Sequence, residues 1–119
     1  MYGVRLTVRE DGKIDYIEQP GGDLKVTKGF YEQAFGWKFQ DWGDDYCAFQ
    51  EGMDGGFSAD ADRVNKPLVI LYAHDLDAME AKVRAAGGQI VRPIFSFPGG
   101  RRFHFTDPAG NELAVWSEG

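Results

Sequence analysis

Hydrophobic and polar residues alternate in many short stretches of the chain, which is typical of strands with one buried face. Residues 1–10 alternate in this way and predict a short strand or a loose arm before Asp11-Gly12. The stretch from Pro93 to Gly100 contains two prolines and two glycines and is expected to be a loop. The other predicted strands are residues 14–18, 37–42, 46–50, 55–58, 68–73, 89–92, 101–106 and 112–117.

Two segments instead have the spacing of apolar residues that is typical of an amphipathic helix. In the first, apolar residues between Leu24 and Phe35 are expected to form one buried stripe. Asp23 is a suitable residue to cap its start, and Gly36 is suited to end it. The second helix is expected to begin after Asp75 and to end at Gly87-Gly88.

The two halves of the chain repeat the same order of elements. Asp75 follows Asp23 by 52 positions (75 − 23 = 52), and Gly88 follows Gly36 by the same number (88 − 36 = 52). Each half reads as a strand, a helix and then three strands. This order predicts an α+β fold of two βαβββ modules. A ferredoxin-like βαββαβ domain is the alternative, but it needs fewer strands in the first half.

The predicted domain organisation follows from this repeat. Residues 1–12 are expected to be an N-terminal arm or an extra strand. Residues 13–119 are expected to form one domain, with the first module at about 13–62 and the second at about 66–117. A chain of 119 residues has the usual size of a single domain.

Composition narrows the class of protein. With 43% apolar and 27% charged residues, the chain has the make-up of a globular protein. A net charge of −6 argues against a nucleic-acid binder. No apolar run has the length of a membrane helix, and the first twenty residues lack a secretory core, so no membrane partner is expected. A single cysteine, Cys47, excludes an internal disulfide and favours a reducing, cytoplasmic location.

Three motifs together carry a resemblance to a known family. They are FYEQAFGW at residues 30–37, AAGGQIV at residues 85–91 and FTDPAGNE at residues 105–112. In this order and spacing the chain resembles the glyoxalase/bleomycin-resistance/dioxygenase superfamily, also called the vicinal oxygen chelate superfamily. Within it, the chain is similar to the group described as predicted enzymes related to lactoylglutathione lyase.

The resemblance implies a curved mixed sheet around a cup, with both helices outside it, and a homodimer. Metal-using members place ligands at three positions, which here fall on Tyr16, Leu68 and Ala114. Leucine and alanine side chains have no donor atom. The usual metal site is therefore expected to be missing, no cofactor is expected, and true glyoxalase I activity is not expected.

Strand alternation predicts which residues line the cup once one residue of each strand is placed. The lining combines an apolar floor, aromatic walls and a few charged groups, which is typical of a small-molecule site. The expected lining residues are Tyr16, Glu18, Leu68, Ile70, Tyr72, Arg102, His104, Glu112 and Trp116.

Several of these residues have a candidate chemical role, and each has a structural alternative. His104 and Glu18 are the candidate acid and base, since imidazole titrates near neutrality and a buried carboxyl can act as a base. Arg102 is suited to bind a carboxylate or phosphate. Each is also compatible with an ordinary sheet position. Gly55-Gly56 predicts free space in the cup or, alternatively, a bend in the strand.

The favoured function is binding of a small, partly aromatic or anionic molecule without a metal. The first alternative is a metal-independent lyase or isomerase that uses Glu18 and His104. A further alternative is a divalent-metal enzyme with ligands displaced to Glu18, His104 and Glu112. The last alternative is a structural dimer whose cup is filled by its own side chains.

Overall fold

The computed structural model describes residues 9–118, and these separate into two compact units, each considered by itself. Unit 1 is Tyr16–Leu68, and unit 2 combines residues 9–15 with residues 69–118. The predicted arm or extra strand at residues 1–12 falls largely on residues 1–8, outside the described part of the chain.

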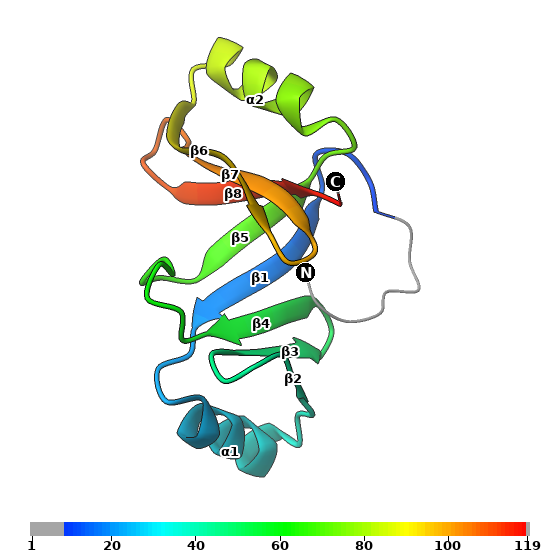
Figure 1. Ribbon diagram of the computed structural model, residues 1–119, viewed down its shortest axis with the longest axis vertical. Coiled ribbons are helices and arrows are strands. Elements are labelled where there is room, and N and C mark those ends of the chain that lie inside the picture. The colour runs from blue at the N-terminus through cyan, green and yellow to red at the C-terminus, as the bar shows by residue number, and fades with distance from the viewer. Residues whose placement is uncertain (1–8, 119) are drawn as a thin grey trace. The chain divides into compact units, whose positions relative to one another are not determined.

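Each unit is built around a four-stranded mixed sheet with one helix (Figure 1). In unit 1 the strand order is β2-β3-β4-β1, with β1 and β4 parallel. In unit 2 the order is β5-β8-β7-β6, with β5 and β8 parallel. The predicted α+β class and the two βαβββ modules are confirmed. The elements are β1 (Ile14–Pro20), α1 (Leu24–Phe35), β2 (Gln40–Asp41), β3 (Tyr46–Gln50), β4 (Asp54–Ser58), β5 (Leu68–Tyr72), α2 (Leu76–Ala85), β6 (Gln89–Phe97), β7 (Gly100–Thr106) and β8 (Glu112–Ser117).

Local signals define the helix ends as the sequence predicts. The Asp23 carboxylate accepts hydrogen bonds from the first-turn backbone N–H groups of Lys25 and Val26. Gly36 ends α1 in the left-handed conformation, with a φ of 72°, which glycine adopts without strain. In unit 2, the Asp75 carboxylate accepts from the backbone N–H of Ala78.

The expectation of one buried stripe along α1 is wrong. No residue of α1 is fully buried, and Phe30 and Phe35 are 57% and 64% exposed. Leu24 and Tyr31, two turns apart on the helix, are the α1 residues that pack against the sheet. Only part of the apolar stripe of α1 therefore lies against the core of unit 1.

The predicted loop from Pro93 to Gly100 is also wrong, because β6 runs through Pro93 as far as Phe97. Pairing between β6 and β7 shifts register between Ile90 and Arg92 and again between Arg92 and Phe95. β6 is the last strand in the order of its sheet. A proline is tolerated there, since an outer strand with a bulge does not need every backbone N–H for the ladder.

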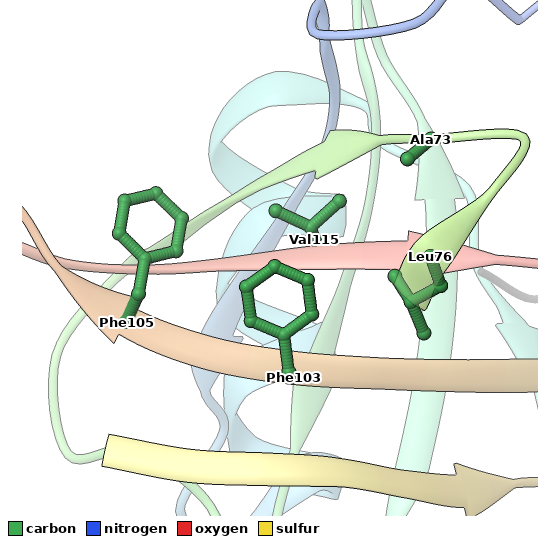
Figure 2. Packing of buried hydrophobic residues seen from close by; sticks show 5 residues of the cluster. All are labelled: Ala73, Leu76, Phe103, Phe105 and Val115. Atoms are coloured by element: carbon green, nitrogen blue, oxygen red, sulfur yellow. The ribbon is translucent and has the colours of Figure 1, made fainter. Parts of the chain in front are cut away.

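Each unit has its own hydrophobic core. In unit 2, Phe103 and Phe105 of β7 and Val115 of β8 lie beside Leu76, the first residue of α2 (Figure 2). Met79 and Val83 of α2 pack against the same cluster. The five buried members of this core are Ala73, Leu76, Phe103, Phe105 and Val115. In unit 1, Cys47, Phe49 and Phe57 form the centre, with Tyr31 and Trp37 packed against them.

Among residues 9–118, no helix is long and apolar enough to cross a membrane.

Candidate functional site

The face of the unit 2 sheet that points away from α2 carries a cluster of charged and aromatic side chains. On β7, Phe103 and Phe105 face the helix, so Arg102 and His104 face the other way. Across the β6–β7 ladder, Arg92 lies opposite His104, and Phe95 lies opposite Arg102. We call the set Arg92, Phe95, Arg102, His104 and Glu112 the arginine–histidine face.

His104 lies at the centre of the arginine–histidine face and has no exposed surface. Its Nδ1 lies 2.9 Å from the Glu112 carboxylate, which is 33% exposed. Its Nε2 is buried and has no hydrogen-bond partner in the described chain. A buried polar atom without a partner costs about 1–3 kcal/mol, so this nitrogen requires an explanation.

The charges around His104 act on its protonation in opposite directions. Burial lowers the pKa of the His104 imidazole, and the positive charges of Arg102 and Arg92 lower it further. The hydrogen bond and the negative charge of Glu112 raise the pKa in opposition. Burial is the largest of these causes, so His104 favours its neutral form.

Aromatic rings accompany both guanidinium groups. The Arg92 guanidinium lies 4.2 Å from the centre of the Phe95 ring, and that of Arg102 lies 5.5 Å from the same centre. The Phe95 ring itself lies against His104, with 5.7 Å between ring centres. These are distances at which cations and aromatic faces attract. The arginine–histidine face therefore combines positive charge with aromatic surface.

Arg92 and Phe95 are functional candidates that the sequence analysis did not identify. Both lie on β6, in and around the stretch that the sequence predicted as a loop. A usable signal was present, since Phe95 and Phe97 alternate with polar Ser96 as strand residues do.

Tyr72 and Trp116, two of the residues expected to line the cup, both make side-chain hydrogen bonds within unit 2. Trp116 donates its indole N–H to the buried Asp15 carboxylate at 2.9 Å, and Tyr72 donates its hydroxyl to Glu118 at 2.7 Å. Burial, with this hydrogen bond, raises the pKa of Tyr72 to about 12. The Arg9 guanidinium lies 5.0 Å from the centre of the Trp116 ring. These contacts fix both rings in place.

In unit 1, Tyr16 and Glu18 meet through a third residue, Tyr46. The hydroxyl groups of Tyr16 and Tyr46 lie 2.7 Å apart, and Tyr46 donates to the Glu18 carboxylate at 3.0 Å. Burial, and then the charge of Glu18, raise the pKa of Tyr46 well above its ordinary value. Glu18 therefore has a neutral hydrogen-bond donor as a neighbour in its own unit.

The glycine pair in β4 leaves room that aromatic rings of the same unit occupy. A side chain added at Gly56 would lie 2.7 Å from the hydroxyl of Tyr16 and against that of Tyr46. One added at Gly55 would meet the ring of Phe49 and the backbone oxygen of Ile17. The space left by the glycines is thus filled by Tyr46 and Phe49.

The predicted site residues divide between the two units. Glu18 belongs to unit 1 and His104 to unit 2, so the proposed acid and base lie in different units. His104, Arg102 and Glu112 are brought together, as just described. Leu68 and Ile70, which were also expected to line the cup, are buried on β5.

The residues present do not fit the divalent ion of metal-using relatives. Of the three expected ligand positions, Leu68 and Ala114 have no donor atom, and the Tyr16 hydroxyl is hydrogen-bonded to Tyr46. Within residues 9–118, no three His, Cys, Asp or Glu side chains are grouped as metal ligands. Of the three residues of the displaced site, Glu18 belongs to unit 1, whereas His104 and Glu112 belong to unit 2.

Solved structures with the same fold include three of differing activity. An NAD-dependent benzaldehyde dehydrogenase from Legionella pneumophila has a TM-score of 0.71 at 12% identity, over 87% of this chain and 98% of that one. A methylmalonyl-CoA epimerase from Mycobacterium tuberculosis has a TM-score of 0.66 at 16% identity, over 97% and 93%. A Mn(II)-bound glyoxalase from Novosphingobium aromaticivorans has a TM-score of 0.64 at 22% identity, over 93% of this chain and 40% of that one. At these identities the likeness shows the fold alone.

The family assignment comes from the sequence. No curated protein matches this chain. The family model described as Glyoxalase/Bleomycin resistance protein/Dioxygenase superfamily matches residues 13–115, which is most of the chain. The chain therefore belongs to the glyoxalase/bleomycin-resistance/dioxygenase superfamily.

Proposed function

We propose that this protein binds a small aromatic anion on the arginine–histidine face, without a metal ion. The observation that carries the proposal is the buried Nε2 of His104, which has no partner in the described chain. A ligand atom at this nitrogen would remove the cost of leaving it unpaired.

The surroundings of His104 support an anionic and planar ligand. The guanidinium groups of Arg92 and Arg102 both lie near the Phe95 ring, and that of Arg102 also lies 5.7 Å from the centre of the Phe97 ring. Arginine binds carboxylates through two parallel hydrogen bonds, and aromatic ligands pack on aromatic side chains. His104 has no exposed surface, so a ligand reaches Nε2 only when a neighbouring side chain moves. Phe95, on the outer strand β6, is the ring that lies against it.

Calorimetric titration with benzoate, phenyl phosphate and neutral benzamide tests the proposal. We expect the anions to bind and benzamide to bind at least about tenfold more weakly, because it lacks the charge that the guanidinium groups attract. Arg102→Gln should weaken binding of the anions. Arg101→Gln is the matched control, since Arg101 is the neighbouring residue of β7 and pairs with Asp77 at 3.4 Å.

Nitrogen NMR locates the bound anion. The chain has two histidines, and the other one, His74, is exposed and hydrogen-bonded to Asp11 at 2.7 Å. Benzoate should shift the ring nitrogen signals of His104 and leave those of His74 unchanged. The proposal is overturned if none of the anions binds, or if binding leaves the His104 signals unmoved.

A second candidate function, acid–base catalysis without a metal, is favoured by the hydrogen bond between His104 and Glu112. A histidine held by a carboxylate is a common arrangement for accepting a proton. In this version Glu112 takes the place that the sequence analysis gave to Glu18. Once a ligand with an acidic C–H is found, its exchange with deuterated solvent should be accelerated by the protein. Exchange that is equally fast with His104→Asn would refute the catalytic role.

A further inference from the structure

The two ring nitrogens of His104 have different surroundings, and the difference determines which of them carries the proton. Nδ1 lies 2.9 Å from a carboxylate oxygen of Glu112, and an ionised carboxylate only accepts hydrogen bonds. Nδ1 is therefore the nitrogen that bears the hydrogen. A neutral imidazole has one N–H, so Nε2 presents a lone pair.

The charged groups that face the imidazole keep it in this form. They come from its own strand and from the two strands beside it: Arg102 on β7, Arg92 on β6 and Glu112 on β8. Burial and both arginines lower the pKa of His104, which favours the neutral ring. Glu112 raises that pKa, but it also accepts the Nδ1 hydrogen and so selects the tautomer.

We infer that the ligand of this site carries its own hydrogen-bond donor, an O–H or N–H, which it gives to His104 Nε2 while the arginines hold its negative charge. Glu112 is a positioning residue in this arrangement, because it acts through the imidazole. The inference rests on the proposed function and narrows the ligand class to hydroxy- or amino-substituted aromatic acids. A plain carboxylate such as benzoate can bind the arginines beside the imidazole, but it offers only acceptors. It should therefore bind more weakly than an acid with a donor, because Nε2 stays unpaired.

The first test needs no ligand. Long-range nitrogen NMR at pH 7 should show His104 with a protonated Nδ1 and a bare Nε2. In Glu112→Gln, the side-chain amide can accept from Nδ1 or donate to it, so both tautomers should appear. Glu32→Gln, an exposed change on α1, is the matched control and should leave the His104 signals unchanged. A wild-type His104 protonated on Nε2 overturns the inference.

The second test compares matched ligands. We would titrate 2-, 3- and 4-hydroxybenzoate against the corresponding fluorobenzoates, which are similar in size but have no donor. At least one hydroxybenzoate should bind about tenfold more tightly than its fluorinated partner, since an unpaired buried acceptor is costly. In His104→Phe, which keeps a ring but cannot accept, this preference should disappear.

The outcomes separate the two proposals. If neither series binds, the proposed function is wrong and the inference is wrong with it. If both series bind with equal affinity, the anion site stands and the requirement for a donor is refuted. If His104→Phe does not fold, Glu112→Gln serves instead. Its mixed tautomers should reduce the preference for hydroxybenzoate, and an undiminished preference refutes the role of Glu112.

Discussion

Replacing Gly56 with alanine tests whether the space beside this glycine is filled by tyrosine rings. The backbone of Gly56 is not in the left-handed region, so alanine is compatible with it. The new methyl group, however, would lie 2.7 Å from the Tyr16 hydroxyl and 2.6 Å from Cζ of Tyr46. A Cβ atom does not come this close to atoms of another side chain, so at least one of the two tyrosines must move.

The cost follows from the contacts that would be broken. Overpacking of a core costs about 1–3 kcal/mol, and each buried hydrogen bond contributes about 1 kcal/mol. Moving Tyr46 breaks two of them, to Tyr16 and to Glu18. We therefore expect Gly56→Ala to lower the free energy of unfolding by about 3 kcal/mol. For a domain of this size that corresponds to a fall in Tm of roughly 10 °C.

Urea unfolding followed by circular dichroism measures this change. The matched control is Gly29→Ala, because Gly29 lies in the middle of α1, is exposed, and a methyl group there meets nothing within 4 Å. Alanine is the better helix former, so this variant should gain about 0.5–1 kcal/mol. Equal stability of Gly56→Ala and the wild type would show that the tyrosines do not occupy this space.

Three further predictions concern stability and reactivity. Asp15→Ala leaves the indole N–H of Trp116 unpaired and should cost about 2 kcal/mol in urea unfolding, whereas Asp77→Ala, at an exposed ion pair, should change stability by less than about 0.5 kcal/mol. Folding lowers the pKa of His104 below its ordinary 6.5, so the unfolded chain binds a proton at this histidine more readily than the folded chain does. The neutral His104 therefore contributes fully to stability above pH 6.5, and this contribution is lost as the pH falls. The unfolding free energy should therefore drop between pH 7 and pH 5 by more in the wild type than in His104→Asn. Cys47 is buried, and burial raises its pKa, so a thiol reagent should react with it in urea but not in the folded protein; rapid labelling without urea would contradict this.

Elements marked by local chemistry were predictable from the sequence. The caps at Asp23 and Asp75 and the glycine at Gly36 act on the backbone beside them, so the helices begin and end where these residues indicate. The strand at residues 46–50 matches β3 for the same reason, since turn residues stand on both sides of it.

The features that sequence reasoning missed depend on partners far away along the chain. Asp15 and Trp116 form a hydrogen bond across 101 positions, and no pattern of either segment indicates it. Pro93 predicts the start of a loop from the sequence alone, because proline usually interrupts a strand. The place of β6 as the last strand of its sheet, together with its shifts of register against β7, makes proline acceptable there. Alternation along β7 predicts that Arg102 and His104 share one face. Arg92 and Phe95, which lie opposite them, could be placed there only if residues 93–97 were known to be part of a strand.

The alternation of β7 has a consequence for how this protein can evolve. Phe103 and Phe105 hold the sheet to α2, while Arg102 and His104, between them in sequence, face the other side. Under the proposed function, variation at the second pair changes ligand preference while the contacts between the sheet and α2 are kept. In a library that randomises β7, alternate positions should therefore have different effects. Changes at the positions that face α2 should lower the yield of folded protein, and changes at the positions between them should alter which ligand is bound.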